Sequence, residues 1–243
     1  MQKAEERLRK ARERPDERER RDERERRDLL GNSYLCEVMA DRVTGTVCRK
    51  CGFRGQMPIF DIINTAESPE LKERLLSGDL FVWECPHCGA KNLVGFPLLY
   101  HDPALKFLAW LGNGQKELED QMVAAFEEQE LENYTARMVD SPGELLEKIK
   151  IFEAGLDDIT MELCKFITRQ DLEKNVDLKF FGLDGPDHTI TFAYPENGQM
   201  QMAETGFEVY EDCAGIIRRN PAVTENARGL VRVNREWLER FIA

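Results

Sequence analysis

Two pairs of cysteines constrain the fold of this chain more than any other feature. Residues 48–52 read CRKCG and residues 85–89 read CPHCG, so each segment holds two cysteines three positions apart with a glycine directly after the second. A tight turn with this spacing points two thiolates at one ion, and the glycine accepts the positive φ that the turn needs. Four thiolates from two such turns suit zinc, with iron as the alternative metal. The sequence therefore predicts one metal site with four ligands: Cys48, Cys51, Cys85 and Cys88.

The composition narrows the compartment and the class of partner. The 243 residues contain no apolar run of the roughly eighteen that cross a bilayer, and the N-terminus is charged rather than apolar. We therefore expect a cytoplasmic protein with reduced cysteines, in which the two C-x-x-C pairs bind metal rather than form disulfides. The formal net charge of −12 disfavours nucleic acid and anionic membranes, so the expected partner is a protein.

Charge and apolar pattern divide the chain into three regions. Residues 1–32 are predicted to be a charged tail, solvated or partly helical, because residues 3–28 are almost entirely charged and offer few apolar side chains to bury. Residues 33–140 are expected to hold a zinc-ribbon-like domain and the helices that follow it. Residues 141–243 are expected to form a C-terminal α+β region. The predicted fold class is α+β, with a ribbon, a helical middle section, and a small antiparallel sheet closed by a helix.

Local signals place the elements of the first 140 residues. Ser68 and Pro69 begin a helix, and Gly78 ends it. Residues 104–140 have a helical pattern that is interrupted by two glycines. The remaining apolar runs predict strands at residues 56–63, 80–84 and 93–100.

In the C-terminal region, the period changes from helical to strand-like. Ser141 and Glu144 form a capping box that begins a helix, and Gly155 separates it from a second helix over residues 156–172. The other predicted elements are strands at residues 177–181, 188–194 and 199–203, a hairpin turn at Asn197-Gly198, and a closing helix at residues 234–242.

The second knuckle has two resemblances, of which the first concerns iron. Residues 83–89, WECPHCG, resemble the second knuckle of rubredoxins, which implies one iron and electron transfer. The segment between the two cysteine pairs carries an amphipathic helix rather than an aromatic-packed loop. We therefore favour zinc and keep the rubredoxin-like iron site as the alternative.

The second resemblance rests on motifs spread over a longer stretch. A knuckle of the form C-P-x-C-G precedes a strand and the sequence PLLYHD at residues 97–102, and further matching motifs are RMV, LLEKI, GLDD and EL at residues 137–139, 145–149, 155–158 and 162–163. Together they resemble the CpXC family of bacterial and archaeal proteins, which share an uncharacterised cysteine-rich domain, over residues 46–169. The resemblance implies a zinc-ribbon-like module and no known reaction. The first knuckle lacks the family's proline but keeps its two ligands.

The three histidines have structural interpretations. His87 lies between the cysteines of the second knuckle and is expected at the surface, since a tetrahedral site takes no fifth ligand. His101 and Asp102 are a candidate base and orienter. Neighbouring residues usually point apart, however, and Asp102 is expected to cap a following helix. His188 is expected beside a turn.

The remaining acidic and cysteine side chains also favour structural roles. Asp157, Asp158 and Glu162 lie at a helix start, where carboxylates complement the helix dipole, and without histidines at matching spacing they do not predict a second metal site. Cys164 is expected to be inert core. Cys36 and Cys213 belong to no knuckle, although Cys36 stays an alternative ligand.

These features favour a zinc-stabilised binding or adaptor protein. Arg49, Lys50, Arg54 and Lys91 give the knuckles a small positive patch, so nucleic acid stays open as a partner. An electron-transfer protein with iron is the second hypothesis. An enzyme with its site in the C-terminal region is the third, although no acid, base and nucleophile converge in the sequence. The sequence leaves the oligomeric state open.

Overall fold

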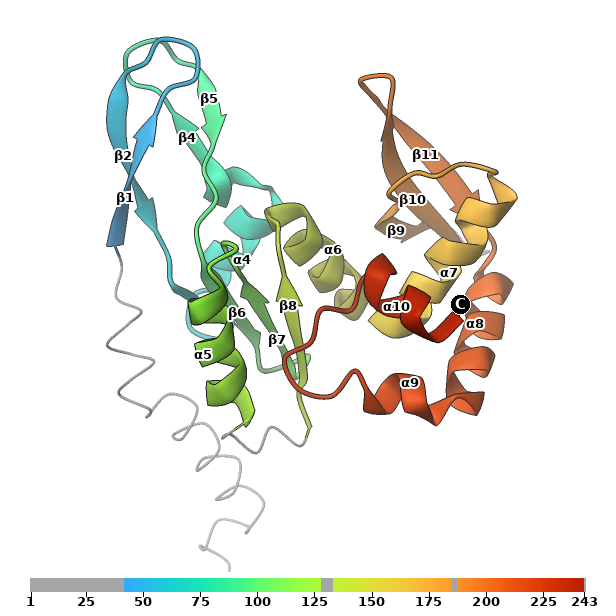
Figure 1. Cartoon of the computed structure of the whole chain (residues 1–243). Coiled ribbons are helices and arrows are strands. Elements are labelled where there is room, and N and C mark those ends of the chain that lie inside the picture. The colour runs from blue at the N-terminus through green and yellow to red at the C-terminus, as the bar shows by residue number, and fades with distance from the viewer. Residues whose placement is uncertain (1–41, 128–132, 185–187, 243) are drawn as a thin grey trace, which may run out of the picture. The chain divides into compact units, whose positions relative to one another are not determined.

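The computed structural model describes residues 42–127, 133–184 and 188–242, and it has the predicted α+β class (Figure 1). Contacts divide the chain into residues 1–42 and 43–243. The charged tail predicted for residues 1–32 lies outside the described residues, and the three predicted regions stay a prediction. The second unit, described below, contains both cysteine pairs.

Four short strands carry the two cysteine pairs (Figure 1). β1 (Arg42–Val47) pairs with β2 (Arg54–Ile59), and β4 (Val82–Glu84) pairs antiparallel with β5 (Lys91–Leu93). Each cysteine pair lies in the loop between the two strands of one of these pairs. We refer to the four strands and the two loops as the cysteine ribbon. A single-turn 3-10 helix at Asp79–Phe81 precedes β4 and overlaps the start of the strand predicted at residues 80–84.

A four-stranded sheet follows along the chain. Its strand order is β3 (Ile62–Asn64), β6 (Leu98–Asp102), β7 (Phe107–Leu111) and β8 (Thr135–Val139). The central strands β6 and β7 are antiparallel, whereas β3 and β8 run parallel to their neighbours. All five residues of β7 are buried, so both faces of this strand are covered.

The helical pattern predicted over residues 104–140 is wrong for two segments. Residues 107–111 and 135–139 are the strands β7 and β8, and α5 (Lys116–Glu127) is the helix among the described residues of this range. The sequence of β7, FLAWL, is a continuous apolar run. Such a run lacks the alternation of a half-buried strand, and its period does not separate it from a buried helix.

Two further helices pack with this sheet and begin as the sequence predicts. α4 (Pro69–Leu76) has proline in its first turn, and the chain leaves it through Gly78 at φ 80°. α6 (Pro142–Glu153) begins at Ser141, whose Oγ accepts the N–H of Glu144 at 3.2 Å. The apolar side chains of both helices join one core with the sheet and the ribbon, with Leu75, Leu145 and Ile149 fully buried.

The C-terminal sheet is antiparallel, as predicted. Its order is β11 (Gln199–Thr205), β10 (Thr189–Glu196) and β9 (Lys179–Asp184). Asn197 and Gly198 connect β10 to β11 with φ of 52° and 76°, which confirms the predicted hairpin turn. Alternate residues of β10 (Ile190, Phe192 and Tyr194) enter the second core.

Helices complete this second core. α7 (Asp158–Asp171) and α10 (Arg235–Ile242) were expected from their periodicity, whereas α8 (Phe207–Arg219) and the short α9 (Pro221–Glu225) had no predicted counterpart. Cys164 of α7 and Cys213 of α8 are fully buried in this core, which confirms the predicted core position of Cys164. No helix among the described residues combines the length and the apolar character needed to cross a membrane.

Candidate metal centre

The two cysteine loops share one backbone geometry. In each loop the glycine donates its N–H to the carbonyl oxygen of the first cysteine at 2.9 Å, from Gly52 to Cys48 and from Gly89 to Cys85. The two glycines have φ of 74° and 66°. These positive values confirm the predicted reason for glycine, since a side chain would strain the turn.

The structure brings the four predicted cysteines together across the ribbon. Their Sγ atoms all lie within 4.8 Å of one another, with Cys48 and Cys88 3.6 Å apart and Cys51 and Cys85 3.7 Å apart. A tetrahedral ion with sulfur ligands at about 2.3 Å separates those sulfurs by about 3.8 Å. The four cysteines are free rather than disulfide-bonded. The donor set and its spacing therefore fit one metal ion.

Backbone N–H groups favour thiolate at the first cysteine. Burial raises the pKa of the Cys48 thiol, but the N–H groups of Cys51 and Lys50, together with the neighbouring thiols of Cys88 and Cys51, lower the pKa to about 6. The N–H of Phe53 lowers the pKa of Cys51, yet burial and the neighbouring thiols raise it to about 12. Because a metal ion binds thiolates, its binding releases the protons that the thiols carry.

Asn92 joins the two loops through its amide side chain. Its Nδ2 donates to Cys48 Sγ at 3.7 Å and to the carbonyl oxygen of Ala90 at 2.9 Å, while its Oδ1 accepts the N–H of Arg49 at 2.9 Å. Only 6% of Asn92 is exposed. No sequence pattern identifies this residue, because an asparagine after a knuckle resembles an ordinary turn residue.

His87 lies at the surface of the second loop, as predicted. It is exposed, and its ring stacks on Phe53 with 6.0 Å between the ring centroids. Phe53 in turn stacks on Trp83 at 6.5 Å. Among the described residues His87 is not part of the group that could hold a metal ion.

His101 and Asp102 do not form a base and its orienter. As neighbours on β6 they point to opposite faces of the sheet. His101 Nε2 lies 3.3 Å from the hydroxyl oxygen of Tyr134, whereas Asp102 accepts hydrogen bonds from Lys72 at 2.9 Å and Tyr100 at 3.1 Å. Asp102 also accepts hydrogen bonds from two backbone N–H groups of the turn at residues 103–106. The prediction that Asp102 caps a helix is therefore wrong, because a turn and not a helix follows β6.

The acidic group at the start of α7 divides into a cap and two buried charges. Asp157 is exposed and accepts the N–H of Thr160 at 2.8 Å, which makes it the N-cap. Asp158 and Glu162 are buried and lie against basic side chains. The acidic residues of this helix start thus have a capping role at Asp157 and ion-pair partners at Asp158 and Glu162.

Asp158 is the centre of a buried ion network between β8, α6 and α7. It accepts two hydrogen bonds from Arg137, at 2.8 and 2.9 Å, and one from Lys148 at 2.8 Å. Burial alone would raise the pKa of Asp158, but the charges of Lys148 and Arg137 hold it well below its usual range. The network continues through Lys165, which pairs with Glu147 at 2.9 Å and Glu162 at 2.7 Å.

Arg137 and Lys148 also hold residues 227–233, which we call the C-terminal segment. Arg137 Nη1 donates to the carbonyl oxygen of Ala227 at 3.0 Å, and Lys148 Nζ donates to that of Val233 at 2.6 Å. Between these two points, Val231 forms an isolated parallel bridge with Arg137 of β8. The C-terminal segment is therefore held by backbone acceptors that the sequence does not mark.

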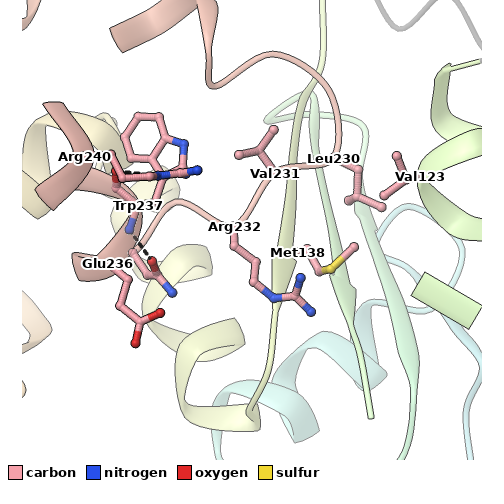
Figure 2. Close-up of a pocket in the computed structure, with 9 residues that line it drawn as sticks. Val123, Met138, Leu230, Val231, Arg232, Glu236, Trp237 and Arg240 are labelled. Atoms are coloured by element: carbon pink, nitrogen blue, oxygen red, sulfur yellow. Dashed lines mark hydrogen bonds between the residues drawn. The ribbon is translucent and has the colours of Figure 1, made fainter. Parts of the chain in front are cut away.

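A pocket of about 500 Å³ lies where this segment approaches β8 and α5 (Figure 2). Its lining includes Met138, Trp237 and Arg232 and contains no histidine, cysteine or serine. Arg232 is already neutralised by Glu119 at 2.7 Å and Asp140 at 2.9 Å. The pocket therefore brings together no acid, base and nucleophile.

Two remaining candidates have simple positions. His188 lies in a turn directly before β10 with φ 50°, beside the ring of Phe207, which agrees with its expected place next to a turn. Cys36 lies outside the described residues, so its role as an alternative ligand stays a prediction.

Comparison with protein-family models matches residues 46–165, about half of the chain, to the CpXC protein family. This span contains both cysteine pairs and runs into the first half of α7. Residues 46–165 are a CpXC domain. The family is cysteine-rich, and the four clustered cysteines lie within the matched span of the CpXC domain. Comparison with curated proteins and with solved structures gives no match.

Proposed function

We propose that the four cysteines of the CpXC domain bind one zinc ion that stabilises the ribbon, and that the protein is a binding or adaptor module for another protein. The carrying observation is the sulfur geometry, with cross-loop Sγ distances of 3.6 and 3.7 Å and all four atoms within 4.8 Å. Zinc is the usual ion of closed four-thiolate sites.

A structural role is favoured by the completeness of the ligand set. Four thiolates fill the tetrahedral positions of the ion, so no position is open for water or substrate. Cys48 and Cys85 are buried within the ribbon core beside Trp83. Bound zinc would therefore contribute its binding free energy to the folding of the ribbon. Reduced thiols also favour the cytoplasm as the location.

Elemental analysis tests the proposal directly. Protein purified without added metal is expected to contain one zinc per chain and to show no visible absorption band. Iron with visible thiolate-to-iron bands would replace this proposal by the rubredoxin-like electron-transfer hypothesis. Protein that folds fully without any metal would contradict the structural role.

Replacing Asn92 with alanine is expected to weaken zinc binding by about 10- to 100-fold, the usual effect of losing a residue that orients a ligand. The variant removes the donor to Cys48 Sγ and leaves the N–H of Arg49 without its acceptor. The dissociation constant can be measured by competition with a chromophoric chelator.

The matched control is His87→Ala in the same ribbon. Because His87 is exposed and contacts Phe53 rather than the sulfurs, its variant should bind zinc within about twofold of the unchanged protein. Equal weakening in both variants would show that Asn92 acts only through general destabilisation of the ribbon.

A further inference from the structure

We infer that the outer surface of the cysteine ribbon binds an acidic, partly apolar segment of the partner protein. This inference rests on the binding function proposed above and names the chemistry of the partner. It follows from the positive charge of the ribbon and from its exposed apolar side chains, since a segment with carboxylates and apolar side chains complements both.

The ribbon carries positive charge in an otherwise acidic protein. Arg49, Lys50, Arg54 and Lys91 are all exposed, and Glu84 is the one carboxylate within residues 43–59 and 82–95. None of the four basic residues takes part in an ion pair within the described residues. The formal charge of these two segments is therefore positive, whereas the whole chain carries −12.

A bound zinc ion leaves this surface basic. Zinc with four thiolates has two negative charges in total, fewer than the three net positive charges that four basic residues and Glu84 give these segments. Cys48 and Cys85 are buried, whereas Cys88 is half-buried and Cys51 is exposed. The cations extend into solvent at the loop tips and strand starts. A carboxylate that approaches the ribbon thus meets more positive than negative charge.

Apolar side chains of the ribbon are exposed as well. Val43 and Val47 occupy positions of the same parity on β1, so they share one face of the strand, and they are 60% and 53% exposed. Leu93 at the end of β5 is 71% exposed, and Phe53 in the first loop is 39% exposed. A protein partner can bury these exposed apolar side chains when it binds the ribbon.

A protein segment fits this combination better than a nucleic acid does. Single-stranded nucleic acid binds through stacking on aromatic faces, but the exposed valines and leucine of the ribbon are aliphatic, and Phe53 already stacks with His87 and Trp83. Carboxylates that alternate with apolar side chains satisfy both the cations and the exposed valines.

A synthetic probe tests the inference on the zinc-loaded full chain. The probe is a fluorescent peptide of about 12 residues in which glutamate alternates with leucine, and binding is followed by anisotropy at about 50 and 300 mM salt. We expect the affinity to fall with salt, and a peptide with glutamine in place of glutamate to bind at least about tenfold more weakly.

Two double variants with the same change in net charge locate the site. The double variant Arg54→Glu with Lys91→Glu reverses the charge of two basic residues on the ribbon. We expect it to reduce the affinity for the glutamate-leucine peptide by at least about tenfold. Arg218→Glu with Arg219→Glu changes two exposed residues at the end of α8, and we expect the affinity to stay within about twofold.

The outcomes separate this inference from the zinc proposal. Absent binding, or equal loss in both double variants, overturns the inference. Tighter binding of a single-stranded oligonucleotide of about 20 nucleotides, lost in the ribbon variant, assigns the surface to nucleic acid instead. Zinc content is measured on every sample. A zinc-loaded protein that does not bind the peptide refutes only this inference, whereas a protein that contains iron or no metal refutes the proposed function.

Discussion

Replacing Asp158 with asparagine is expected to lower the free energy of unfolding by about 3–5 kcal/mol, the usual cost of removing one partner from a buried ion pair. The carboxylate has no exposed area and accepts hydrogen bonds from Arg137 and Lys148. An asparagine of the same shape would leave Arg137 buried without this counter-charge and would leave Lys148 paired with Glu162 at 3.7 Å. For a folded unit of this size the loss corresponds to a fall in Tm of about 10 °C. Urea unfolding at neutral pH measures it.

Asp157 provides a control one residue away. It is exposed and acts as the N-cap of α7, and asparagine caps a helix about as well as aspartate does. Asp157→Asn should therefore change the free energy of unfolding by less than about 0.5 kcal/mol. A similar large loss in both variants would show that the effect belongs to the helix start rather than to the ion network.

The effect of Asp158 should also depend on pH. Its pKa in the folded protein is lowered from an unfolded value of about 3.9, so its stabilisation is present above that value and is lost as the pH falls through the folded pKa. The difference in the free energy of unfolding between the unchanged protein and Asp158→Asn should consequently be largest at about neutral pH and should shrink below about pH 4. A difference that stays constant down to about pH 2 would contradict an ionised Asp158 in this ion pair.

Replacing Cys85 with serine is expected to abolish stoichiometric zinc binding and to unfold the ribbon. Serine is a poor zinc ligand, and structural zinc contributes roughly 10–16 kcal/mol of apparent binding free energy to small zinc-dependent folds. Cys85 is 1% exposed and packs beside Trp83, which is 8% exposed, so loss of the ribbon should expose this indole. Trp110 and Trp237 lie in β7 and α10 and should stay buried. A red shift of tryptophan fluorescence with retained helical circular dichroism is the expected signature.

Cys213→Ala is the control for this loss. Cys213 is buried in α8 in the second core and lies outside the four-cysteine group, so its variant should keep one zinc per chain. Retention of zinc by Cys85→Ser would contradict the ligand set. Complete loss of helical structure in Cys85→Ser would show instead that the ribbon does not unfold independently of the sheet and helices with which it shares a core.

The features that the sequence predicts correctly are local conformations, which depend on residues close to one another in the sequence. The glycines of the two loops, the Asn197-Gly198 turn and the Ser141 cap each follow from a conformation that a few residues determine. β7 was assigned wrongly because its burial on both faces comes from distant elements and removes the alternation that identifies a strand. No element was predicted for residues 207–219, where α8 presents Cys213 and Ile217 to the core.

The candidate site divides in the same way. The four cysteines are visible in the sequence because their spacing alone implies shared ligation. Asn92 and the ion network are not, since Arg137 and Asp158 are 21 residues apart and Lys148 reaches a carbonyl 85 residues away. Charged residues on a helix usually face solvent, and only the packing of α6 on α7 makes a buried Lys148 predictable.

The attachment of the C-terminal segment has a consequence for how related sequences can diverge. Arg137 and Lys148 bind this segment at the carbonyl oxygens of Ala227 and Val233. Every residue type supplies such an oxygen, so substitutions between these two points leave both bonds available. An inserted or deleted residue would instead move one carbonyl away from its buried cation. Among relatives that keep the network, residues 227–233 should therefore vary in composition while their number stays constant.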